Sequence, residues 1–246
     1  MNKAYADLIQ LLSQGKYNET LEAIGQKRYS PEIPEGRVWE MCGLAHYGLE
    51  EITAAIRALE HANTLVPLSL VAQLSLASAY LHEKYSLTAE AIYLHLQSQP
   101  ATYESKTICT GVAEGLTRLD LHSDAVTVCQ RSLLRYPQSH RLNFLCGINT
   151  RHDGAPAHVS KDYFRRALAQ LPESIHYAIE YAKECLNVDE IEEAEEALEG
   201  INPPELQCVA ALQRLKLVYE QMNNGEMEEL CDCRLRELYY KMKSKY

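Results

Sequence analysis

Apolar residues recur along most of this chain at intervals of three and four residues, the spacing of one face of an α-helix. The first apolar stripe spans residues 5–12 and the last spans residues 227–242. Short polar turns, several of them containing Gly, Pro or Asn, separate successive stripes. The pattern predicts an all-α protein whose helices, each of roughly 10–15 residues, pair as antiparallel hairpins.

Residues 36–67 show this pattern most clearly, as two short amphipathic helices closed by a proline. Gly43 has no side chain, so the second helix can approach the first closely. Trp39 and Leu59 are expected to fill the gaps between the two helices, and Pro67 cannot continue the second helix because it lacks an N–H group. One hairpin cannot bury its own apolar faces and therefore has to stack on neighbours.

The same stretch matches the spacing of a known repeat. Trp39, Cys42, Gly43 and His46 occupy the slots of the W-x₂-L-G-x₂-Y signature, with Cys42 in place of leucine and His46 in place of tyrosine. The later slots are filled by Ala55, Leu59, Ala62 and Pro67. The stretch resembles a tetratricopeptide repeat. The resemblance implies a right-handed α-α superhelix whose first helices line a concave groove that holds peptides.

Prolines recur along the chain with the period of this repeat. The intervals between Pro34, Pro67, Pro100, Pro137, Pro172 and Pro204 are 33, 33, 37, 35 and 32 residues, with a mean of 34. The period predicts a single solenoid of about seven hairpins over residues 1–246. Its approximate repeats are 2–29, 36–69, 70–101, 102–139, 140–173, 174–204 and 205–246. Further signature positions are Ala89, Ala125, Gly147 and Ala194.

The formal charge of the 246-residue chain is −10, which disfavours nucleic-acid binding and with it the RNA-binding pentatricopeptide relatives of similar repeat length. No apolar run approaches the roughly eighteen residues of a membrane span. The N-terminal residues lack the features of a signal peptide. We therefore expect a cytoplasmic protein that binds neither nucleic acid nor membrane.

None of the eight cysteines forms a CxxC pair, and Cys42, Cys129 and Cys146 fall at positions expected to be interior. The sequence therefore predicts neither a disulfide framework, nor a metal site, nor a cofactor. It also contains no metalloprotease, nucleophile-elbow, phosphate-loop or dinucleotide-binding motif, so we expect no catalytic residues and no enzyme activity.

The exposed positions of successive first helices supply the candidate partner-binding residues of the groove. These are Arg37, Tyr47, Arg118, Arg141, Phe144, Arg151, His176 and Lys183. Four of them are basic residues of the middle and late repeats, and arginine pairs bidentately with carboxylates, so the groove could hold an acidic segment or a C-terminal tail. Alternatively, these cations are solvated or pair with Glu40 and Glu114. The lysine and asparagine set of a chaperone-tail clamp is not found on consecutive first helices.

These observations favour a scaffold or adaptor that binds a partner's peptide or helix. One alternative is a structural subunit of a homo- or hetero-oligomer that makes contact through its terminal helices. Another is a chaperone of the type III secretion kind. The last helix is expected to cap the solenoid, or to form a homodimer contact over residues 235–242. The acidic run at residues 189–199 is either a solvated face or a patch for a basic partner.

Overall fold

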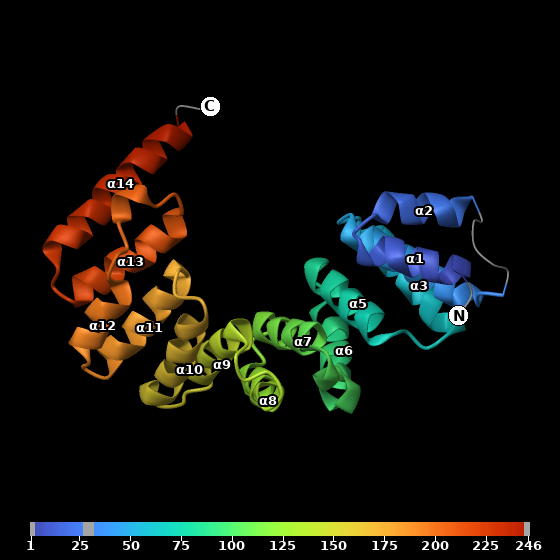
Figure 1. Ribbon diagram of the computed structural model, residues 1–246, viewed down its shortest axis with the longest axis horizontal. Coiled ribbons are helices and arrows are strands. Elements are labelled where there is room, and N and C mark those ends of the chain that lie inside the picture. The colour runs from blue at the N-terminus through green and yellow to red at the C-terminus, as the bar shows by residue number, and fades with distance from the viewer. Residues whose placement is uncertain (1–2, 27–31, 244–246) are drawn as a thin grey trace. The chain divides into compact units, whose positions relative to one another are not determined.

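The computed structural model describes residues 3–26 and 32–243 and the side chains within them from residue 6 onwards, so the Tyr5 side chain and residues 27–31 of the first linker lie outside it. Fourteen α-helices and two 3-10 helices are present in the described ranges, which contain no strand (Figure 1). The all-α prediction is confirmed. No helix in those ranges combines the length and the apolar character needed to cross a bilayer.

The helices follow one another as hairpins of a first and a second helix. They are α1 (Lys3–Ser13) and α2 (Tyr17–Gly25), α3 (Glu35–Gly48) and α4 (Ile52–Leu65), α5 (Leu70–His82) and α6 (Ser86–Ser98), and α7 (Lys106–Arg118). They are followed by α8 (His122–Leu133), α9 (His140–His152) and α10 (Ala157–Gln170), α11 (Ile175–Asn187) and α12 (Ile191–Leu198), and α13 (Val209–Gln221) and α14 (Gly225–Lys243). The 3-10 helices are η1 (Pro100–Glu104) and η2 (Pro203–Glu205).

The chain divides into two compact units, Met1–Asp124 (unit one) and Ala125–Tyr246 (unit two). Each unit contains consecutive hairpins with a core of its own. That both units form one continuous right-handed solenoid stays a prediction.

Every first helix ends in the same turn. A residue with positive φ follows the helix. The backbone N–H of the residue after it donates to the carbonyl oxygen five residues earlier, as Glu51 does to His46 at 3.0 Å. This is the helix-ending arrangement that satisfies carbonyl groups otherwise left without a donor. The seven turn residues are Gly15, Glu50, Lys84, Asp120, Gly154, Asp189 and Asn223. They lie 34 to 36 residues apart, so the backbone itself repeats with the tetratricopeptide period.

Four of the first helices also begin alike. A serine hydroxyl accepts a hydrogen bond from the backbone N–H three residues on, which caps the helix. The four serines are Ser69, Ser105, Ser139 and Ser174, at the starts of α5, α7, α9 and α11. Since start and end are both defined locally, the first helices of these hairpins all have 13 residues.

Small residues let the two helices of a hairpin touch. A Cβ atom on Gly43 would come within 2.6 Å of Leu59, and one on Gly147 within 2.8 Å of Phe164. The alanines of the repeat signature have no exposed surface; these are Ala55, Ala62, Ala89, Ala125 and Ala194. Pro67 follows α4, where Val66 has already turned to an extended backbone, as the residue before a proline prefers.

The expectation that Trp39 fills the gap between α3 and α4 is wrong. Leu59 fills that gap and is fully buried, whereas 37% of Trp39 is exposed. The Trp39 ring meets His61 of α4 edge-on at a centroid distance of 4.8 Å. Because Gly43 brings the two helices so close, an indole has no room between them and lies across the rim. Cys42, on the same rim, is only half-buried, which corrects its assignment to the interior.

Candidate partner-binding surfaces

Unit one contains a cavity of about 690 Å³ among its first helices. Its apolar lining comes from three consecutive hairpins: Ile9 and Leu12 of α1, Met41 and Leu44 of α3, and Val71 of α5. Ile9 and Val71 are 40% and 52% exposed, which is unusual for large apolar side chains in the core-facing pattern of a soluble helix. The cavity is therefore an apolar surface that the described part of the chain leaves uncovered.

One wall of this cavity is an internal ion pair. Arg37 pairs with Glu40 one turn along α3, and a second oxygen of Glu40 accepts the backbone N–H of Ser69 at 3.2 Å. Glu40 is only 5% exposed, so it joins α3 to the start of α5 rather than facing solvent. The expected groove residue Arg37 does line the cavity, but its charge is already compensated.

Tyr47 also lines the cavity, half-buried, near the last turn of α3. Tyr47 is near enough to the Tyr93 hydroxyl to act on it electrostatically, and that hydroxyl lies 3.0 Å from Ser78 Oγ. Burial raises the pKa of Tyr93, and Glu114 and Arg118 act on it in opposite directions. Arg118 of α7 is exposed, and it does not line the cavity.

In unit two, Arg151 is held by two buried carboxylates of the next first helix. Its guanidinium lies 2.7 Å from Glu180 and 3.2 Å from Glu184, whose side chains are 3% and 1% exposed. Ser160 of α10 donates a further hydrogen bond to Glu184 at 3.1 Å. Arg151 is thus an internal counter-ion, in keeping with the pairing alternative but with carboxylates other than those expected from the sequence.

Burial alone would raise the pKa of Glu180, but the hydrogen bond and charge of Arg151 outweigh it and hold that pKa below its ordinary value. Two further cations approach the same carboxylate, Lys183 at 3.7 Å and Arg214 of α13 at 3.6 Å. Arg214 also lies 3.2 Å from Nδ1 of His176. Two of the expected groove residues, His176 and Lys183, are therefore brought together around Glu180.

Phe144 was expected on the exposed face of the groove, and this is wrong. Only 4% of Phe144 is exposed. Its ring stacks on Tyr177 at a centroid distance of 4.5 Å and meets Phe164 edge-on at 5.6 Å. The next hairpin covers it, because a ring of this size gains more from the core of unit two than from solvent. Arg141, one turn before it on α9, is exposed.

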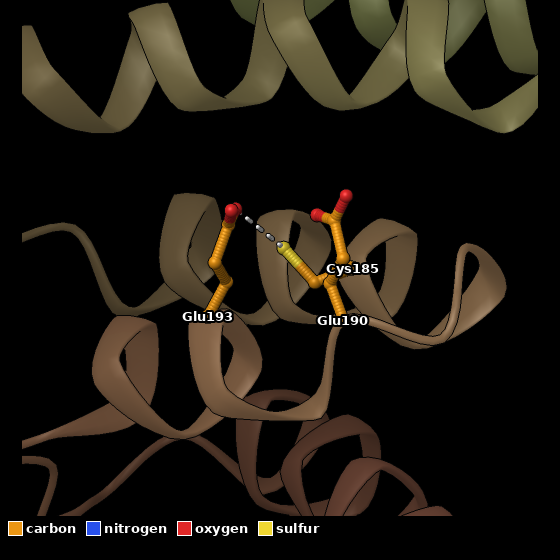
Figure 2. A group of neighbouring side chains, drawn as sticks. All are labelled: Cys185, Glu190 and Glu193. Carbon is orange, nitrogen blue, oxygen red and sulfur yellow. Dashed lines mark hydrogen bonds between the residues drawn. The ribbon is translucent and has the colours of Figure 1, made fainter.

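The acidic helix brings Cys185, Glu190 and Glu193 close enough to resemble a metal-binding group (Figure 2). Cys185 Sγ lies 3.9 Å from a Glu193 oxygen, and that oxygen also accepts from the Tyr181 hydroxyl at 2.7 Å. Lys161 of α10 pairs with both glutamates. Burial raises the pKa of the Cys185 thiol to about 11, which keeps it protonated at neutral pH. The cluster joins α10 to the start of α12 through ion pairs, and the absence of a metal site stays a prediction.

No protein-family model and no curated protein matches the chain. Several solved structures resemble it. PilF of Pseudomonas aeruginosa has a TM-score of 0.64 at 16% identity, over 86% of this chain and 97% of that one. MamA from Desulfovibrio magneticus RS-1 has a TM-score of 0.58 at 14% identity, over 66% and 90%. MamA MSR-1 has a TM-score of 0.57 at 16% identity, over 67% and 92%. All are tetratricopeptide-repeat proteins. The chain has the tetratricopeptide-repeat fold.

Within this tetratricopeptide-repeat fold, the candidate residues gather on two different first-helix surfaces, one in each unit. Sequence reasoning missed the apolar cavity residues Ile9 and Val71, because an apolar residue on a helix is normally assigned to the core. It also missed the buried pair of Glu180 and Glu184. The interval of 33 residues between Arg151 and Glu184, close to one repeat, was the signal that could have found their contact.

Proposed function

We propose that this chain is a non-catalytic, cytoplasmic protein-interaction module that reversibly binds a peptide or helix of a partner protein on its first-helix surface. Proteins with this fold are typically interaction scaffolds and generally not catalysts. The observation that carries the proposal is the cavity of about 690 Å³ among α1, α3 and α5. Its size falls in the range of about 300–1,000 Å³ that is usual for binding pockets.

The lining favours a segment that presents uncharged apolar side chains. Covering an apolar side chain such as Ile9 or Val71 contributes up to about 1.5–3 kcal/mol, and less here because both are already partly buried. The charges of Arg37 and Glu40 cancel at the cavity wall, so a charged side chain would gain no unpaired counter-ion there. Tyr47 also lines the cavity, and a tyrosine hydroxyl can both donate to and accept from the backbone of a bound segment.

The test uses peptides selected from a random display library against the wild-type chain. The double variant Ile9→Glu, Val71→Glu should weaken these peptides at least about tenfold, since two carboxylates would enter the apolar lining. The matched control is Leu65→Glu, Leu87→Glu, which adds the same charge at apolar positions 45% and 84% exposed in the same unit.

We expect the selected peptides to carry apolar residues and the control variant to bind them as the wild type does. Equal weakening by both double variants would mean that only net charge matters. Unchanged binding to the cavity variant would place the binding site elsewhere. Either result, or a selection without apolar residues, would overturn the proposed site.

A second candidate role is homodimerisation through α14. Leu235 and Leu238, within the stretch expected to form the contact, are each only 8% exposed and pack inside the chain, which leaves them unavailable to a partner. Tyr239, Tyr240 and Met242 of the same helix are 44%, 77% and 56% exposed. A dimer would therefore depend on these three, and Tyr240→Glu should convert it to a monomer in sedimentation equilibrium.

A further inference from the structure

Positive side chains from three consecutive first helices surround His176 in unit two. The Arg214 guanidinium lies 3.2 Å from His176 Nδ1, and Lys183 lies two turns further along the same helix as His176. Arg141 holds the same place in α9 as His176 holds in α11, since each lies 13 residues before the turn residue that ends its helix. The charges of all three cations act on the His176 ring, which therefore lies in a basic surface.

The two buried carboxylates beneath this surface do not neutralise all of its positive charge. Arg151, Lys183 and Arg214 are three cations against Glu180 and Glu184, in a chain whose formal charge is −10. Arg151 takes the short contacts with both carboxylates. Lys183 and Arg214 remain 3.7 and 3.6 Å from Glu180, longer than the roughly 2.7–3.2 Å of a hydrogen bond. Their side chains are 38% and 49% exposed, so their donors can reach another acceptor.

His176 can add a donor of its own. Burial lowers the pKa of His176, and the charges of Arg214, Arg141 and Lys183 lower it further against the opposite effect of Glu180, so the ring is neutral at pH 7. Because Arg214 donates to Nδ1, the proton of the neutral ring lies on Nε2. The His176 ring is exposed enough for this N–H to meet a ligand.

We propose that Lys183, Arg214 and the Nε2–H of His176 bind a carboxylate of an acidic segment in a partner protein. Arginine pairs with carboxylates through parallel hydrogen bonds, which suits Arg214. A long nucleic acid fits less well, because the surrounding chain carries excess negative charge and would repel a polyanion beyond this surface. The site lies in unit two, apart from the unit-one cavity, so either proposal can fail without the other.

The experiment measures binding of acetylated hexaglutamate to the full chain by isothermal titration at low salt, with hexaglutamine as the uncharged probe. The test variant is Lys183→Gln, Arg214→Gln. The matched control is Arg135→Gln, Arg236→Gln, which removes two exposed cations of the same unit that form no ion pair within the described residues. Circular dichroism and thermal melting verify that both variants remain folded.

We expect hexaglutamate to bind, hexaglutamine not to bind, and the test variant to lose about tenfold or more in affinity while the control loses less than about twofold. The cavity variant Ile9→Glu, Val71→Glu should bind hexaglutamate as the wild type does. No binding to the wild type, or equal losses in test and control variants, would overturn the proposal. Tighter binding of a single-stranded oligonucleotide than of hexaglutamate, lost in the test variant alone, would overturn the assignment to carboxylates.

Discussion

Replacing Arg151 tests whether its buried ion pairs hold unit two together. Arg151→Met keeps most of the apolar stem of the side chain. In the wild type the Arg151 guanidinium lies 5.5 Å from the centre of the Phe164 ring. It removes the charge between Glu180 and Glu184, whose side chains are 3% and 1% exposed. The variant therefore leaves two carboxylates inside the protein without their principal counter-ion.

Removing one partner of a buried ion pair typically costs about 3–5 kcal/mol, because the remaining charge stays desolvated. The lower end applies here. Lys183 and Arg214 still lie within 3.7 Å of Glu180, and Ser160 still donates to Glu184. We expect a loss of about 3 kcal/mol at pH 7, which corresponds to a fall in Tm of roughly 6–12 °C for a chain of this size.

The loss should depend on pH in a defined direction. In the wild type the pKa of Glu180 is lowered, so this group contributes stability that is present above its unfolded pKa and lost as pH falls through the folded one. Without Arg151, burial dominates and raises that pKa in the variant. Protonation then relieves the buried charge, so the difference between variant and wild type should shrink as the pH falls from 7 towards 4.

Urea unfolding at pH 7 and near pH 4 measures both effects, with Arg135→Met as the control because Arg135 is exposed. Adding Glu180→Gln and Glu184→Gln to Arg151→Met should restore part of the stability, since neutral amides are cheaper to bury than unpaired carboxylates. The reasoning is refuted if Arg151→Met falls within about 0.5 kcal/mol of Arg135→Met at pH 7, or if its deficit grows as the pH is lowered.

Two other predictions concern packing and thiol exposure. Gly43→Leu should destabilise unit one by about 1–3 kcal/mol in urea unfolding, because the new Cβ atom would lie 2.6 Å from Leu59. The control Gly225→Leu should cost clearly less, because a Cβ atom there would have no neighbouring atom within 4 Å. Equal losses in the two variants would contradict the packing argument. Cys208 and Cys233 are exposed and should react first with a thiol reagent, the half-buried Cys42 should react more slowly, and the five buried cysteines should react only on unfolding. Uniform labelling of the native protein would be inconsistent with the burial.

The hairpins were predictable because their cause is local and periodic. Gly43 and Pro67 have the same meaning in any helix pair, and the period of 34 residues identifies the repeat. The turns at Gly15 and Asn223 were also predictable from residue type, but those at Glu50, Lys84, Asp120 and Asp189 were not. Glu50, Lys84 and Asp120 adopt positive φ although a glycine or asparagine is the usual residue there. The hydrogen bond to the carbonyl five residues back and the stacking of the next hairpin impose this conformation.

The site was less predictable because it depends on neighbours one repeat away. Phe144 and Arg141 are one turn apart on α9, and the helical pattern alone assigns both to the same face. The ring of Tyr177 on the following hairpin removes Phe144 from solvent. Glu180 is charged and would be assigned to the surface from its residue type, yet the arginine of the preceding first helix allows it to be buried.

Positions in different first helices can be compared by counting back from the turn residue that ends each helix. This comparison shows how one repeated backbone presents two different surfaces. The position six residues before the turn is Ile9 in α1 and Leu44 in α3, and both line the unit-one cavity. The same position in α11 is Lys183, which lies in the basic surface of unit two. The position is not free of packing everywhere, since Leu44 packs partly against the core of unit one, and Ser78, at the same place in α5, lies 3.0 Å from the Tyr93 hydroxyl of α6. Ile9 and Lys183 are both exposed, so substitutions at these two should change affinity before they change stability.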